Sequence, residues 1–183
     1  MKGEVFTEFL SMADKNWGEN SVDAVLNRCP LASKGAYSAV GYYDSSELFT
    51  LIGAFSSETS MAVDEMQRRF GHWMLKHFVE SYPDAFESKT DTFSFLESIE
   101  SEIHAEVRKL YPDAELPTFV SEFPETGVML FTYISDRNLV PFCQGLIEAT
   151  FEHYCERAEI SVDTMVTTPK TRALFTLKRL GTL

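Results

Sequence analysis

The chain has 183 residues and a formal net charge of −12, because 16 Lys and Arg stand against 28 Asp and Glu. Its length predicts one globular domain, and the acidic balance argues against nucleic acid or an anionic membrane surface as a partner, since both bind clustered cations. Aromatic residues make up 13% of the chain, and the simplest interpretation of its 15 Phe is a Phe-rich core.

The sequence carries no sign of export or of membrane insertion. No apolar run approaches the ~18 residues of a spanning helix, and Met1–Phe6 lacks the apolar region of a signal peptide. The cysteines Cys29, Cys143 and Cys155 form no C-x-x-C pair and are too few for a disulfide framework. We therefore expect a cytoplasmic protein.

Up to about Pro112 the apolar residues recur with helical spacing. This pattern predicts helices over residues 2–14, 21–28, 61–82 and 92–110. Ser21 and Ser60 are the expected N-caps of the second and third helices, because their hydroxyl oxygens can accept a hydrogen bond from the first helical turn. Pro83 and Pro112 are expected to end the third and fourth helices.

Beyond Pro112 the apolar residues alternate in short runs that are typical of strands. The alternation predicts strands over residues 118–123, 128–135, 160–167 and 172–180. Turns at 124–127 and 168–171 join the first pair and the second pair, and a helix over 139–158 separates the pairs. Several helices followed by β-β-α-β-β predict an α+β fold, a helical lobe packed against a small antiparallel sheet.

His104 is the histidine with the most suggestive position. It lies at the edge of an apolar helical stripe, with Glu100 and Arg108 one turn to either side. A half-buried imidazole there can present one ring nitrogen to a cavity and keep the other for a hydrogen-bond acceptor. A single histidine is more often an ordinary core or surface residue, so this position alone is a weak signal.

Tyr133, Ser135 and Arg137 form a second candidate site at the end of a predicted strand. Their spacing of two residues places all three side chains on one face. A phenol, a hydroxyl and a guanidinium together suit the carboxylates of a ligand, with the Arg binding in a bidentate manner. The alternative is an ordinary polar face in contact with water.

These residues and their surroundings resemble the H-NOX family, the haem-nitric oxide/oxygen binding domains, in its bacterial stand-alone form. The likeness covers essentially the whole chain, with the motifs in the family's order. They are Met1-Lys2-Gly3-x-Val5-Phe6, Gly18, Asp23-x-Val25-Leu26, His104, Leu110-Tyr111-Pro112, Pro117 and Tyr133-x-Ser135-x-Arg137.

The resemblance implies one haem b per chain, bound between a distal helical subdomain at about 1–60 and a proximal α+β subdomain at about 61–183. His104 would be the proximal iron ligand, and the binding would be non-covalent because no C-x-x-C-H occurs. Tyr133, Ser135 and Arg137 would hold the propionates, and Pro117 would pack on the porphyrin. The implied distal wall is apolar and consists of Val5, Phe9, Met74, Phe78, Phe142 and Leu146.

The resemblance also implies a choice of gas. In oxygen-binding members a distal Tyr donates a hydrogen bond to bound dioxygen, and the matching position here is Phe142, which cannot donate. We therefore expect a sensor of nitric oxide, and of carbon monoxide, that excludes stable dioxygen binding. His77 lies near Met74 and Phe78, so a second axial ligand from His77 is the competing interpretation.

Signalling in the family begins when nitric oxide weakens or breaks the iron–histidine bond. Gly71 and Gly145 lie inside predicted helices, either as hinges for the resulting motion or as points of close helix packing. The acidic residues within 84–106 form either a solvated face or a docking surface. Cys143, His153 and Cys155 do not form a four-ligand set, so no structural zinc is expected.

The chain leaves no room for an output domain, so we expect no catalytic activity and a separate effector, by family analogy a histidine kinase or a cyclic-di-GMP enzyme. Two other functions remain open. One is a haem enzyme that scavenges nitric oxide or handles dioxygen, which would need polar distal groups. The other is a haem-free module whose Tyr133, Ser135 and Arg137 bind a small carboxylate.

Overall fold

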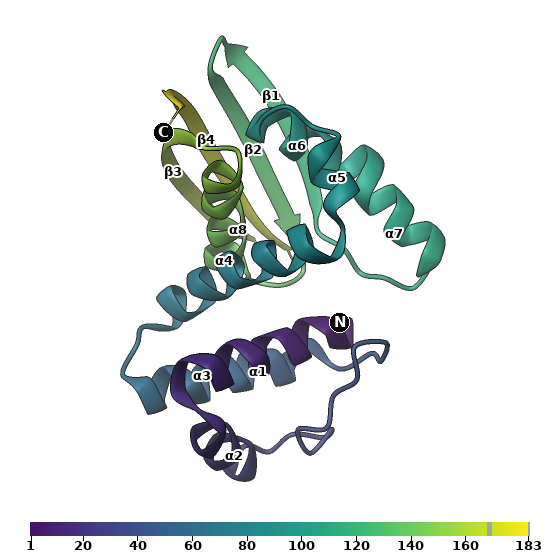
Figure 1. Ribbon diagram of the computed structural model, residues 1–183, viewed down its shortest axis with the longest axis vertical. Helices are drawn as coiled ribbons and strands as arrows, with labels where there is room; N and C mark the ends of the chain where they lie inside the picture. The colour runs from purple at the N-terminus through teal and green to yellow at the C-terminus, as the bar shows by residue number, and fades with distance from the viewer. Residues whose placement is uncertain (168–169, 183) are drawn as a thin grey trace.

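The computed structural model describes residues 1–167 and 170–182, which form two lobes joined by one long helix (Figure 1). The N-terminal lobe contains α1 (Gly3–Trp17), α2 (Glu19–Arg28), α3 (Ser45–Thr59) and the first half of α4 (Val63–Ser81). The sheet lobe contains α5 (Pro83–Glu87), α6 (Thr92–Ser98), the π-helical turn η1 (Ile99–Ile103), α7 (His104–Leu110), β1 (Thr118–Glu125), β2 (Val128–Ser135), α8 (Val140–His153), β3 (Glu156–Thr167) and β4 (Lys170–Thr182).

The four strands form one antiparallel sheet in the order β1-β2-β4-β3. Alternate residues of the two central strands are buried, and the register places Phe131 opposite Phe175 and Tyr133 opposite Ala173. This buried face packs against α6 and α8 in the core of the sheet lobe. The structure therefore confirms the predicted α+β fold with its four-stranded antiparallel sheet.

The core of the N-terminal lobe contains four buried phenylalanines among its aliphatic residues. The Phe9 ring packs edge to face against Phe55 and Phe70, with ring centroids 5.7 and 5.1 Å apart. Such pairs add about 0.5–1.5 kcal/mol each beyond the area that they bury. The remaining buried members are Phe6, Met12, Ala13, Val25, Leu31, Leu48, Leu51, Ile52, Met66 and Met74. The abundance of Phe in the sequence is thus mainly a property of the two cores.

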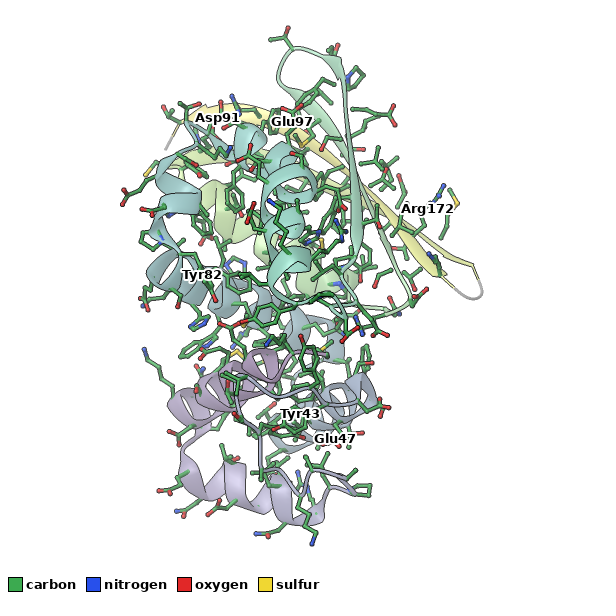
Figure 2. The ribbon with its side chains drawn as sticks, turned by 90° about the vertical axis from the view of Figure 1, so that its right-hand side faces the viewer. Tyr43, Glu47, Tyr82, Asp91, Glu97 and Arg172 are labelled. Carbon is green, nitrogen blue, oxygen red and sulfur yellow. The ribbon has the colours of Figure 1, made fainter. Side chains whose placement is uncertain are left out.

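The sequence pattern did not predict helix α3. The Asp44 side chain caps it by accepting a hydrogen bond of 2.8 Å from the Ser46 backbone, a signal that was legible in the sequence. Within α3, the buried Glu47 accepts hydrogen bonds from the Ser33 and Tyr37 hydroxyls and so holds the preceding loop against the helix. Figure 2 shows Tyr43 and Glu47 in this lobe, and Asp91 and Glu97 at the far end of the other.

Both predicted N-caps are wrong. Helix α2 begins two residues before Ser21, after Gly18, whose φ of 84° lets the chain turn directly out of α1. Ser60 instead ends α3 in a left-handed conformation, with φ at 55°, and the N-cap of α4 is Ala62. In both cases the connection to the preceding helix is very short, so the end of that helix determines where the next helix begins. The predicted serine is therefore not the N-cap.

Other boundaries also differ from the prediction: β3 begins at Glu156 instead of residue 160, and β4 includes Lys170 and Thr171 of the predicted second turn. The helix expected over 92–110 is divided by the π-helical turn η1, and the helix expected over 139–158 ends at His153, because Cys155 has a φ of 54° and β3 begins directly after it. In the first hairpin, β1 continues through Glu125 and leaves Gly127, at φ 80°, in the turn. Thr168 and Pro169 of the second predicted turn lie outside the described residues.

Helices α4 and α8 pack at very close range through two glycines. A Cβ added at Gly71 would overlap the Phe142 carbonyl and lie 2.7 Å from the Leu146 nitrogen. One added at Gly145 would overlap the Arg68 carbonyl. Of the two interpretations of these glycines, the contact supports close helix packing, while a hinge remains a prediction. No helix within the described residues is long and apolar enough to cross a bilayer.

We expect Gly145→Ala to destabilise the protein by about 1–3 kcal/mol, because the added methyl forces two backbones apart. Urea unfolding followed by circular dichroism measures the change. The matched control is Gly53→Ala in the middle of α3, where an added Cβ has no neighbour within 4 Å; it should be neutral or stabilise by up to about 1 kcal/mol. Equal effects at the two glycines would contradict this account of the packing.

Candidate functional site

His104 is the first residue of α7 and directly follows the π-helical turn η1. Its backbone N–H bonds the Ile99 carbonyl, one residue farther back than in an α-helix. Such single widened turns are rare and occur frequently at functional sites. The imidazole is buried, with 9% of the residue exposed.

The His104 ring is held by a carboxylate one turn earlier. Its Nδ1 lies 3.0 Å from Glu100 Oε2, and Glu100 also accepts hydrogen bonds from the Arg108 guanidinium at 2.7 Å and the Phe119 backbone N–H at 3.3 Å. Burial raises the pKa of Glu100, but these donors outweigh it and hold that pKa below its ordinary value. Burial lowers the pKa of His104 by more than the carboxylate raises it, which favours a neutral imidazole.

Phe119 connects this histidine to the second candidate site. Its ring lies 5.6 Å from the His104 ring and 5.9 Å from the Tyr133 ring, and it stacks on Phe131 at 4.7 Å. The half-buried Pro117 is two residues earlier, at the entry to β1. Phe119 therefore contacts both candidate sites, His104 on one side and Tyr133 on the other.

Tyr133 and Ser135 lie at the end of β2, and both hydrogen-bond to the backbone of Arg137 in the turn that follows the strand. The Tyr133 hydroxyl donates to the Arg137 carbonyl at 2.8 Å, and Ser135 Oγ accepts from the Arg137 N–H at 3.1 Å. Burial raises the pKa of Tyr133 to about 12, so it remains a neutral donor. The Arg137 guanidinium binds the backbone carbonyl and the side-chain carboxylate of Glu115, so its partners in this structure come from the segment before β1.

The six predicted wall residues also lie together, at the border of the two lobes. Phe9 and Met74 are buried in the N-terminal core, and the other four, Val5, Phe78, Phe142 and Leu146, pack against it. Phe78 and Leu146 contact the core of the sheet lobe as well. The Phe142 ring lies 5.1 Å from that of Phe70.

His77 faces away from this wall. Its Nε2 lies 2.9 Å from Glu4 Oε1 and its Nδ1 lies 3.6 Å from Glu8 Oε2, so both ring nitrogens face carboxylates of α1. The Trp73 indole donates to the same Glu8 carboxylate at 2.9 Å. This arrangement gives His77 a role in joining α1 to α4 and argues against the competing interpretation as an iron ligand.

Two further residues of the site were missed by sequence reasoning. Phe119 was counted only as a strand residue, and Glu115 lies in a segment without periodicity, so neither carried a legible signal. Both reach the site through contacts between segments distant in the chain. Among the described residues, no group of three or more His, Cys, Asp or Glu is arranged to hold a metal ion by itself.

Comparison with known proteins places these observations in context. The family model described as Haem-NO-binding (HNOB) matches residues 2–162, whereas no curated protein matches. The crystal structure of the Fe(II) unliganded H-NOX protein from K. algicida is similar over 100% of this chain and 98% of that one, with 35% identity and a TM-score of 0.92.

Two more distant structures share the fold. An H-NOX protein from S. oneidensis in the Fe(II)NO ligation state is 23% identical, covers 99% of this chain and 100% of that one, and gives a TM-score of 0.89. An oxygen-binding H-NOX domain related to soluble guanylate cyclases, solved as its oxygen complex, is 20% identical over 100% of this chain and 96% of that one, with a TM-score of 0.84. Proteins of this fold thus occur with different gases.

Proposed function

The chain belongs to the haem-NO-binding or H-NOX family of haem-based gas sensors, and we propose that it senses nitric oxide, and carbon monoxide, at a ferrous haem whose proximal ligand is His104. The haem b would be bound non-covalently, one per chain. Bound there, it would supply a ferrous iron that can bind a diatomic gas. The chain itself would have no catalytic activity.

The donor set fits this group. The observation that carries the proposal is the buried His104 imidazole, whose Nδ1 is engaged by Glu100 while no described residue bonds its Nε2. A neutral imidazole with one nitrogen bonded to a carboxylate and the other free is the usual arrangement of a histidine metal ligand. The Phe119 ring lies 5.6 Å from the imidazole and would supply an apolar surface beside it, and Pro117 precedes Phe119 by two residues at the entry to β1.

Tyr133, Ser135 and Arg137 would bind the propionates. The Tyr133 and Ser135 hydrogen bonds fix the backbone of Arg137 and thereby orient its guanidinium. That guanidinium already pairs with one carboxylate, that of Glu115, so a propionate would join or replace a partner of the same chemistry. Arg137 would therefore act as the anchor, and the two hydroxyl residues would position it.

The preference for nitric oxide rests on the apolar distal wall. Dioxygen bound to ferrous iron carries partial negative charge and gains most from a hydrogen-bond donor, and none of the six wall residues can donate. A scavenging enzyme that handles dioxygen would need polar groups in the same place. This chemistry favours the sensor over the enzyme.

One experiment tests the proposal directly. The ferrous haem-loaded protein is equilibrated with air and, separately, with nitric oxide. We expect no persistent oxy spectrum in air and a stable nitrosyl spectrum with nitric oxide. A persistent oxy form would contradict the gas preference, and absence of a Soret band after haem supplementation would favour the haem-free carboxylate-binding module.

The signal would pass to a separate effector, a histidine kinase or a cyclic-di-GMP enzyme by family analogy, in the cytoplasm, where free cysteines such as Cys143 persist. One contact between the two lobes would carry a movement of α7 to the N-terminal lobe. The Lys2 ammonium of the N-terminal lobe lies 3.6 Å from the centre of the Tyr111 ring, directly after α7. Release of His104 would move α7 and, through this cation–π contact, the N-terminal lobe relative to the sheet lobe.

A further inference from the structure

The carboxylate of Glu100 links two side chains of its own helix. It stands four residues before His104 and eight before Arg108, at distances of 3.0 and 2.7 Å. The π-helical turn η1 includes Glu100 and ends immediately before His104, so this widened turn lies between the carboxylate and the imidazole along the chain. A third donor, the Phe119 N–H, comes from β1 and fixes the carboxylate against the sheet.

The Arg108 guanidinium and the Phe119 N–H both donate to Glu100, so the residue acts as an anionic acceptor. Its hydrogen bond therefore places the proton of the neutral His104 ring on Nδ1 and leaves the lone pair on Nε2. A carboxylate that accepts this proton gives the imidazole partial negative character and makes Nε2 a stronger electron donor. Arg108 withdraws part of the carboxylate charge and moderates the effect.

We propose that Glu100 is a positioning residue that sets the strength of the bond between His104 and the haem iron, and with it how readily nitric oxide releases His104. The inference rests on the proposed function, since it requires His104 as the proximal ligand. The alternative is that Glu100 only forms a helix-surface ion pair with Arg108, in which case the iron–histidine bond does not depend on it.

The test compares variants by resonance Raman spectroscopy of the ferrous unliganded protein and by the coordination of its nitric oxide complex. Glu100→Gln keeps an acceptor but removes the charge, and Glu100→Ala removes both. We expect the iron–histidine stretching band to shift to lower frequency in Gln and further in Ala, with a rising share of the five-coordinate nitrosyl form. Arg108→Met should shift the band in the opposite direction, because it returns charge to Glu100.

The matched control is Glu102→Gln, in the same widened turn, where the carboxylate pairs with Lys89 at 2.7 Å and has no contact with His104. It should leave the band unchanged. An unchanged band in both Glu100 variants, or the same shift in Glu102→Gln, would overturn the inference. A wild-type protein without any iron–histidine band would instead refute the proposed function, so the two failures are distinguishable.

Discussion

Replacement of His104 by Gly is expected to abolish the wild-type Soret spectrum of the ferrous protein. Loss of a hydrogen-bond partner of a metal ligand typically lowers metal affinity by about 10–100-fold, and loss of the ligand itself should lower it by more. The variant leaves a small cavity beside Glu100, whose carboxylate stays in place through Arg108 and Phe119. Added imidazole should enter that cavity and restore the spectrum, which absorption titration with haem measures.

The control for this experiment is His77→Ala. His77 contacts Glu4 and Glu8 instead of the distal wall, so its loss should loosen the contact between α1 and α4 without changing the spectrum. An unchanged Soret band in His104→Gly would refute the proximal assignment. A six-coordinate low-spin ferrous spectrum that disappears in His77→Ala would instead identify His77 as a second axial ligand.

The substitution Phe142→Tyr is expected to give a haem protein that retains dioxygen in air. A phenol at this position adds a donor to an otherwise apolar wall, and a hydrogen bond to a group with developing charge contributes about 1.5–3 kcal/mol. That corresponds to a rise of roughly 10–100-fold in dioxygen affinity. Dioxygen titration of the ferrous protein measures it, and nitric oxide binding should change far less.

Phe123→Tyr serves as the matched control, because Phe123 is an exposed residue of β1 and its added hydroxyl lies on the protein surface. It should leave dioxygen affinity unchanged. Unchanged affinity in Phe142→Tyr would show that this side chain does not line the gas pocket, although its ring packs 5.1 Å from Phe70 in the N-terminal core.

The fold class was predictable because it depends on short-range pattern. Strand β2 alternates strictly between buried and half-buried residues. This alternation matches the period of two that the sequence shows. The helical stripes identified α1, α4 and α8 in the same way. The N-caps were predicted less well. Ser21 and Ser60 are residue types that favour an N-cap, but the ends of α1 and α3 determine where the next helix begins. The missed α3 is an error of a different kind, because its Asp44 cap was readable.

The sequence by itself determined which residues could carry the chemistry: the motif resemblance singled out His104 and the Tyr133, Ser135 and Arg137 group. Only the tertiary structure decided how their surroundings act on them. The close helix packing at Gly145, the Glu115 carboxylate on Arg137 and the Phe119 N–H on Glu100 all join segments more than 15 residues apart. Local pattern contains no information on such contacts, because they form only when the lobes and the sheet pack.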